Sequence, residues 1–119
     1  MLDGLMARAN ADPMLMRRAR FLELEFGLDM GDGPAVIQVN KGHVSASAAG
    51  PAARPVFSIA GPKEAWAEFS RPLPKPGFHH LMAMNENRHT RFEGDVYPLL
   101  VNLFFITGLL SKLRQGEAA

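Results

Sequence analysis

The most apolar stretch of the chain lies near its C-terminus, between Asp95 and Lys112. Residues 96–111 carry no charge, and Asp95 can cap a helix because its carboxylate accepts hydrogen bonds from first-turn N–H groups. At 100° per residue, one apolar stripe consists of Leu99, Leu103, Ile106, Leu110 and Leu113, and a second consists of Tyr97, Val101, Phe104, Phe105 and Gly108. A surface helix needs only one such stripe, so we expect protein, a partner, a membrane or a ligand to cover the second.

A membrane span is the first explanation to test, and the segment is too short for it. A span needs about 20 consecutive apolar residues, whereas Asn102 and Gly108 interrupt this shorter run. Helices that lie in a membrane interface usually carry a strongly basic polar face, which this segment lacks. Transient membrane contact therefore stays open as the weaker alternative.

Upstream of this helix the apolar pattern changes its period from helical to strand-like. Alternating apolar and polar positions predict strands at residues 22–26, 35–40, 43–48 and 55–60, and a fifth is expected at 88–93. Lys41-Gly42 predicts a tight hairpin between the second and third strands. Short successive strands with tight turns favour a mostly antiparallel sheet.

The remaining segments read as helices and one extended connection. Residues 2–18 are expected to be helical, with Asp12-Pro13 as a cap and first-turn pair. Gly61-Pro62 begins a helix around Trp66, and residues 78–85 form a short one. Residues 70–77 hold prolines at alternate positions, which predicts an extended loop that is either a lid or a plain connector.

Composition limits the class of protein. The chain has 119 residues, a net charge of +1 and no cysteine, so we expect one globular domain without disulfides. A charge this close to neutral gives no reason to expect nucleic-acid binding. The N-terminal residues lack an apolar signal-peptide core, so we expect a cytoplasmic protein. We divide residues 1–119 into an N-terminal helical segment (1–19), a core (20–114) and a frayed tail (115–119).

Motifs for catalysis or metal binding are missing from the sequence. Gly31-x-Gly33 lacks the third glycine of a dinucleotide loop, and no serine lies in a Gly-x-Ser-x-Gly elbow. His79 and His80 would project about 100° apart on a helix, whereas helical ligand pairs share one face. Arg17, Arg18 and Arg20 precede two glutamates, which is typical of a solvated face. We therefore expect no metal, no cofactor and no catalysis by this chain alone.

Three motifs and their order carry a family resemblance. They are Val36-Ile37-Gln38-Val39 before the Lys41-Gly42 turn, Phe57-Ser58-Ile59-Ala60-Gly61-Pro62 with Trp66, and Phe92-Glu93-Gly94-Asp95 before the final helix. Residues 20–114 thus resemble the sterol carrier protein 2 domain. The resemblance implies an α+β sandwich, with helices packed on a mostly antiparallel five-stranded sheet around an apolar tunnel for lipids. It does not imply catalysis, and such domains also occur as accessory modules beside enzymes, including proteins that handle isoprenoid-quinone precursors. Because the chain lacks a peroxisomal C-terminus, a bacterial-type lipid binder is favoured.

We accordingly predict non-enzymatic binding or transfer of an apolar ligand, such as a fatty acid, an acyl-CoA, a sterol-like lipid or an isoprenoid lipid. The predicted ligand-binding residues are the second stripe together with an aromatic and a flexible side chain from earlier helices. They are Trp66, Met82, Tyr97, Val101, Phe104, Phe105 and Gly108. The alternative is a protein-interaction or accessory module, in which the second stripe docks on an enzyme partner or forms a homodimer.

Overall fold

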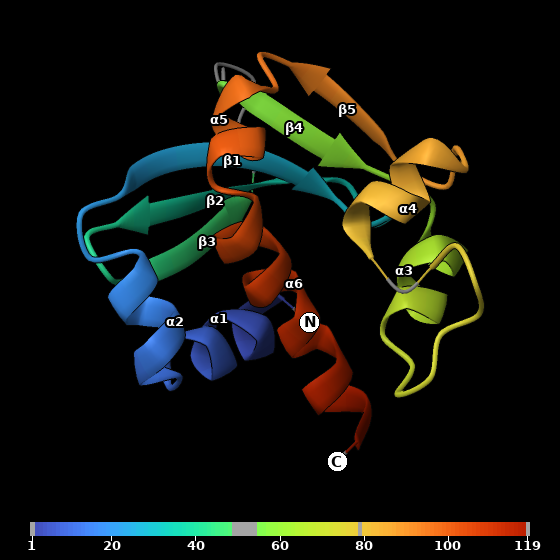
Figure 1. Cartoon of the computed structure of the whole chain (residues 1–119), viewed down its shortest axis with the longest axis horizontal. Coiled ribbons are helices and arrows are strands. Elements are labelled where there is room, and N and C mark those ends of the chain that lie inside the picture. Colours follow the sequence, from blue (N-terminus) through green and yellow to red (C-terminus); the bar gives the residue numbers. More distant parts are fainter. Residues whose placement is uncertain (1, 49–54, 79, 119) are drawn as a thin grey trace.

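The structure is a computed structural model that describes residues 2–48, 55–78 and 80–118. A sheet forms one layer, and α1, α2 and α6 lie against one of its faces, with α3 and α4 at one end (Figure 1). In chain order the elements are α1 (Leu2–Asn10), α2 (Pro13–Arg18), β1 (Glu23–Asp29), β2 (Pro34–Asn40), β3 (Val44–Ala48), β4 (Phe57–Ala60), α3 (Lys63–Phe69), α4 (Leu81–Glu86), β5 (Arg91–Gly94), α5 (Tyr97–Val101) and α6 (Leu103–Ala118).

The five strands form one sheet in the order β3-β2-β1-β4-β5. β1 and β4 run parallel, and the other neighbouring pairs are antiparallel, which confirms the predicted mostly antiparallel sheet. Lys41 and Gly42 have φ values of 46° and 88° between β2 and β3. Positive φ at both central residues is the geometry of the tight turn that suits the twist of a hairpin, so this prediction is also confirmed.

Alternation along the strands separates a core face from a solvent face. The buried side chains on the core face include Phe26, Leu28, Ile37, Val39, Val44, Phe57 and Ile59. Phe26 and Phe57 stack across the parallel pair with ring centroids 5.1 Å apart. Outward side chains such as Glu25, Gln38 and Ser45 are exposed. The sheet therefore buries one face beneath the helices and presents a mostly polar face on the other side, where Val36 is nevertheless buried.

The N-terminal segment forms two helices that meet at the predicted cap. The Asp12 carboxylate accepts hydrogen bonds from the N–H groups of Met14 and Leu15, at 3.0 and 3.2 Å. Pro13 occupies the first position of α2, where a missing N–H costs little. Asp12 also binds Lys112 of α6, with Oδ2 2.6 Å from Nζ. The cap therefore joins α2 to α6 as well as starting α2.

The C-terminal helix is broken, which corrects the expectation of one continuous helix. Asn102 has φ −109° and ψ 25° between α5 and α6, and its side-chain amide donates to the carbonyl of Pro98 at 2.9 Å. A side chain that binds a nearby carbonyl competes with the helical backbone pattern. Asp95 accepts a hydrogen bond from the Tyr97 N–H at 3.1 Å, although Val96 occupies the cap position itself.

Two further boundaries bear on the predictions. α6 continues to Ala118, so its helical backbone enters the segment expected to fray, and fraying stays a prediction. Within the described ranges, no helix is both long and apolar enough to cross a membrane.

Candidate ligand-binding site

One side of α5 and α6 faces the core, as the first stripe predicted. Leu99, Ile106 and Leu110 have no exposed surface, and Leu113 is buried as well. Leu103 is only half-buried, since it begins α6 directly after the break at Asn102. The first stripe is thus ordinary core, apart from its member beside the break.

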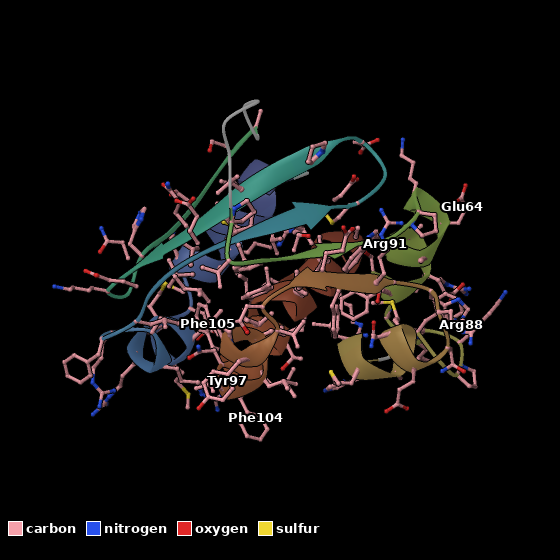
Figure 2. The ribbon with its side chains drawn as sticks, turned by 90° about the horizontal axis from the view of Figure 1, so that it is seen from above. Glu64, Arg88, Arg91, Tyr97, Phe104 and Phe105 are labelled. Atoms are coloured by element: carbon pink, nitrogen blue, oxygen red, sulfur yellow. The ribbon has the colours of Figure 1, made fainter. Side chains whose placement is uncertain are left out.

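The second stripe divides between core and surface. Tyr97, Val101 and Phe104 are 70%, 61% and 82% exposed, whereas Phe105 is buried and Gly108 is half-buried. Phe105 follows Phe104 by 100° around the helix, which is enough to turn its ring inward. In Figure 2 the ring of Phe104 projects away from the ribbon on the same side of the molecule as Tyr97. Side chains that share a stripe in the sequence therefore have different surroundings.

Two open grooves adjoin this surface, and both are lined by Arg18 and Phe104. The first has a volume of about 420 Å³ and is also lined by Val101 and Phe105. The second has a volume of about 310 Å³ and is also lined by Phe69, Leu81, Gly108 and Arg114. We call them together the α6 grooves. They are open to solvent, so the enclosed tunnel implied by the resemblance stays a prediction.

The charge of the α6 grooves is positive. Arg18 and Arg114 line them, and no carboxylate does so among the residues that the structure describes. Arg114 lies with its guanidinium 4.4 Å from the ring centre of Phe69 and donates from Nε to the Phe69 carbonyl at 2.8 Å. Burial lowers the pKa of Arg114. Arg18 makes no ion pair or side-chain hydrogen bond within the described part of the chain.

The other polar groups of the grooves are engaged locally. Thr107 donates its hydroxyl to the Leu103 carbonyl at 2.8 Å, and Ser111 donates to the Gly108 carbonyl at 2.7 Å. The His80 ring accepts a hydrogen bond from the Met82 N–H at 3.1 Å, capping α4. These bonds leave an apolar wall with a cationic edge, a surface that suits an amphipathic ligand.

Two predicted site residues do not line the α6 grooves. Trp66 is buried and meets Phe69 edge-on with ring centroids 5.8 Å apart. Its Nε1 donates a hydrogen bond to the Asp29 carbonyl at 3.2 Å. Met82 is half-buried on α4 and lines neither groove. The structure therefore brings together Val101, Phe104, Phe105 and Gly108 as groove lining, with Tyr97 exposed nearby. A ligand-binding role for any of the seven stays a prediction.

Sequence reasoning missed the contributions of other elements to the grooves. Arg18 was assigned to a solvated cluster, and Phe69, Leu81 and Arg114 were not singled out. Each lies far along the chain from at least one groove neighbour, so helical spacing alone could not place them together. The only indication in the sequence was the presence of arginines, whose charge and apolar stem suit an anionic amphiphile.

The described histidines, His43, His80 and His89, do not form a metal cluster. His89 stacks on Phe78 with ring centroids 4.0 Å apart, and His80 caps α4. His79 lies outside the described residues. No group of three potential metal ligands occurs in residues 2–48, 55–78 and 80–118.

Comparisons with known proteins give the fold a precedent. Neither a protein-family model nor a curated protein sequence matches the chain. A crystal structure of sterol carrier protein 2 matches with a TM-score of 0.72 at 14% identity, over 95% of this chain and 92% of that one. The ubiquinone synthesis protein UbiJ-SCP2 matches with a TM-score of 0.64 at 12% identity, over 94% and 86% of the two chains. The chain therefore has the sterol carrier protein 2 fold, as the sequence motifs predicted.

A third match shows the same fold inside an enzyme. The stereoselective inverting sec-alkylsulfatase Pisa1 from Pseudomonas sp. matches with a TM-score of 0.59 at 14% identity. The match covers 89% of this chain but 15% of the sulfatase chain. Because one fold serves several functions, the function of this chain must be argued from its own surfaces.

Proposed function

We propose that this domain binds an apolar, lipid-like ligand along α6 and performs no chemistry of its own. The observation that carries the proposal is the pair of α6 grooves, which share Phe104 and Arg18 as lining residues. Their volumes fall in the range of small-molecule sites, about 300–1,000 Å³. The names of two matched structures, a sterol carrier protein and a ubiquinone synthesis protein, support a lipid as the ligand.

The energetics of an apolar tail are sufficient. Burial gains about 0.8 kcal/mol per CH₂, so a chain of about fourteen carbons offers on the order of 10 kcal/mol. Ordering and association costs offset several kcal/mol of that gain, which leaves affinity in the micromolar range. The exposed rings of Phe104 and Tyr97 would lose water contact when a tail lies against them.

Charge narrows the class of ligand. Arg18 lines both α6 grooves and its charge has no partner within the described part of the chain. A carboxylate or phosphate head beside Arg18 would form a charge-assisted hydrogen bond. Among the lipids considered, this favours fatty acids, acyl-CoA and isoprenoid phosphates over neutral sterols.

A matched pair of aspartate variants tests the proposal. Phe104 and Phe21 are 82% and 84% exposed, but only Phe104 lines the α6 grooves. Phe104→Asp should keep native circular dichroism and bind a fluorescent fatty acid at least about tenfold more weakly, because it removes an apolar wall and repels an anionic head. Phe21→Asp should bind as the wild type does.

Equal binding by both variants and the wild type would overturn this site. The protein-interaction alternative predicts a different outcome, in which Phe104→Asp changes the oligomeric state on a sizing column and no fluorescent fatty acid binds the wild type. Native mass spectrometry of wild-type protein purified from cells adds an independent readout, since a bound lipid adds mass to the monomer.

A further inference from the structure

Another hollow, apart from the α6 grooves, lies at the carboxyl ends of the parallel strands β1 and β4, beside the start of β5. Its volume is about 600 Å³, and its lining includes Asp29 of β1, Ala60 of β4 and Arg91 of β5. We call it the strand-end pocket. Figure 2 places Arg88 and Arg91 at the end of the molecule where α3 and α4 lie, away from Tyr97 and Phe104. The strand-end pocket is therefore separate from the α6 grooves.

Glycine backbone forms part of this wall. Gly31 has φ +94°, and a Cβ there would lie 2.7 Å from the Lys63 backbone nitrogen. A Cβ on Gly61 would lie 2.9 Å from the Thr90 methyl carbon. Side chains at these two positions would collide with neighbouring chain segments. Glycine at positions 31 and 61 is therefore required by the close packing of these chain segments against each other.

The charges that line the pocket are Asp29, Arg88 and Arg91. The Asp29 carboxylate accepts a hydrogen bond from the Gly31 N–H at 2.9 Å. Arg91 is paired with Glu93, with Nε 2.8 Å from Oε1. Arg88 makes no side-chain hydrogen bond or ion pair within the described residues. The pocket therefore offers the Arg88 guanidinium, which has no ion-pair partner among the described residues, and it is also lined by the Asp29 carboxylate.

Two further features single out this corner of the fold. Arg88 has φ +62° directly after the end of α4, where its N–H and that of His89 donate to the carbonyls of Asn85 and Met84, a helix-ending conformation that glycine adopts at the lowest cost. The Thr90 hydroxyl oxygen is buried and has no hydrogen-bond partner within the described residues. A turn selected for shape alone would be better served by glycine at position 88.

We propose that the strand-end pocket binds a carboxylate or phosphate group, with the Arg88 guanidinium as its charge partner. The planar guanidinium matches the geometry of such anions and can bind two oxygens at once. The anion is either a free small molecule or the head of a lipid, and both sources share this chemistry. The inference goes beyond the proposed function, since no α6 groove residue takes part in it.

Amide NMR titration of the full chain with inorganic phosphate tests the inference, with chloride balancing ionic strength. The amides of Gly31, Gly61 and Thr90 should shift and saturate. Arg88→Gln should weaken this binding at least about tenfold, the loss expected when a charge-assisted bond is removed. Arg17→Gln, which removes an exposed arginine from α2, should leave it unchanged.

A glycine variant separates lost binding from lost folding. Arg88→Gly relieves the left-handed conformation, so it should raise the melting temperature while abolishing phosphate binding. Dihexanoyl phosphatidic acid, used below its micelle concentration, distinguishes the two sources of the anion. Saturable, Arg88-dependent shifts with either compound support the inference, and a response to the phosphatidic acid alone assigns the anion to a lipid head. Shifts that fail to saturate with both compounds, or that persist unchanged in Arg88→Gln, would overturn it.

Discussion

The two apolar sides of α5 and α6 have opposite surroundings. On the side that faces the sheet, Leu99, Ile106 and Leu110 are completely buried, whereas on the other side Val101 and Phe104 are mostly exposed. Both sides consist of large apolar side chains, so hydrophobicity alone does not explain the difference. The cause is geometric, because α1 and α2 also pack against α6 and leave one side of it facing the grooves. An apolar side without a cover is where a ligand or a partner can gain binding energy.

The largest expected effect comes from a charge placed on the packed side. Leu110→Asp buries an unpaired carboxylate in the core, which costs upwards of about 4 kcal/mol. This variant should be mostly unfolded at 25 °C, with loss of the far-ultraviolet circular dichroism of the wild type. Urea unfolding of the wild type supplies the reference free energy.

Val101→Asp is the matched control, since it makes a similar change on the open side at a residue that is 61% exposed. Surface substitutions usually change stability by about 0.5 kcal/mol or less, so Val101→Asp should unfold at nearly the wild-type urea concentration. Unfolding as severe as that of Leu110→Asp would mean that both sides are covered in solution. A sizing column would then show whether a second copy supplies the cover.

An intermediate effect is expected at Gly108, on the boundary between the two sides. A Cβ at this position would lie 3.0 Å from Leu15 Cδ1 of α2, the flexible end of a side chain. Gly108→Ala should therefore be neutral or stabilising by up to about 1 kcal/mol, because alanine favours the helix. Gly108→Leu should fill part of the second groove and weaken fatty-acid binding about tenfold, at a stability cost of about 1–3 kcal/mol. Fluorescence titration and urea unfolding measure the two effects, and unchanged affinity in Gly108→Leu would place the ligand elsewhere.

Local patterns predicted the scaffold because local chemistry determines it. The alternation in β1 and β2, the Lys41-Gly42 hairpin and the Asp12 cap each depend on neighbouring residues, and each is present in the structure. The break at Asn102 was missed because a side-chain amide within an apolar run looks like a tolerated helical residue. It binds Pro98 instead.

The candidate site depends on long-range packing, so the sequence predicted it only in part. Val101 and Phe104 were found because an exposed apolar side is visible from helical spacing. Phe105 was assigned to the same stripe, although its ring turns inward, since spacing does not say which edge of a wide apolar surface is covered. Arg18 was missed because it and the groove residues of α5 and α6 lie far apart in the chain and come together only in the folded structure.

The smallest expected effect concerns the ion pair between Asp12 and Lys112, which joins α2 to α6. The Lys112 ammonium, by its hydrogen bond, holds the pKa of Asp12 below its ordinary value. A lowered pKa in the folded state means that this stabilisation is complete above the ordinary pKa of aspartate, about 4, and is lost as the pH falls through the lowered value. Asp12→Asn retains a good helix cap but removes the charge, so it should melt below the wild type at pH 7. The difference in melting temperature should shrink steadily on acidification below pH 4, and a difference that does not depend on pH would show that capping, rather than the ion pair, joins the two helices.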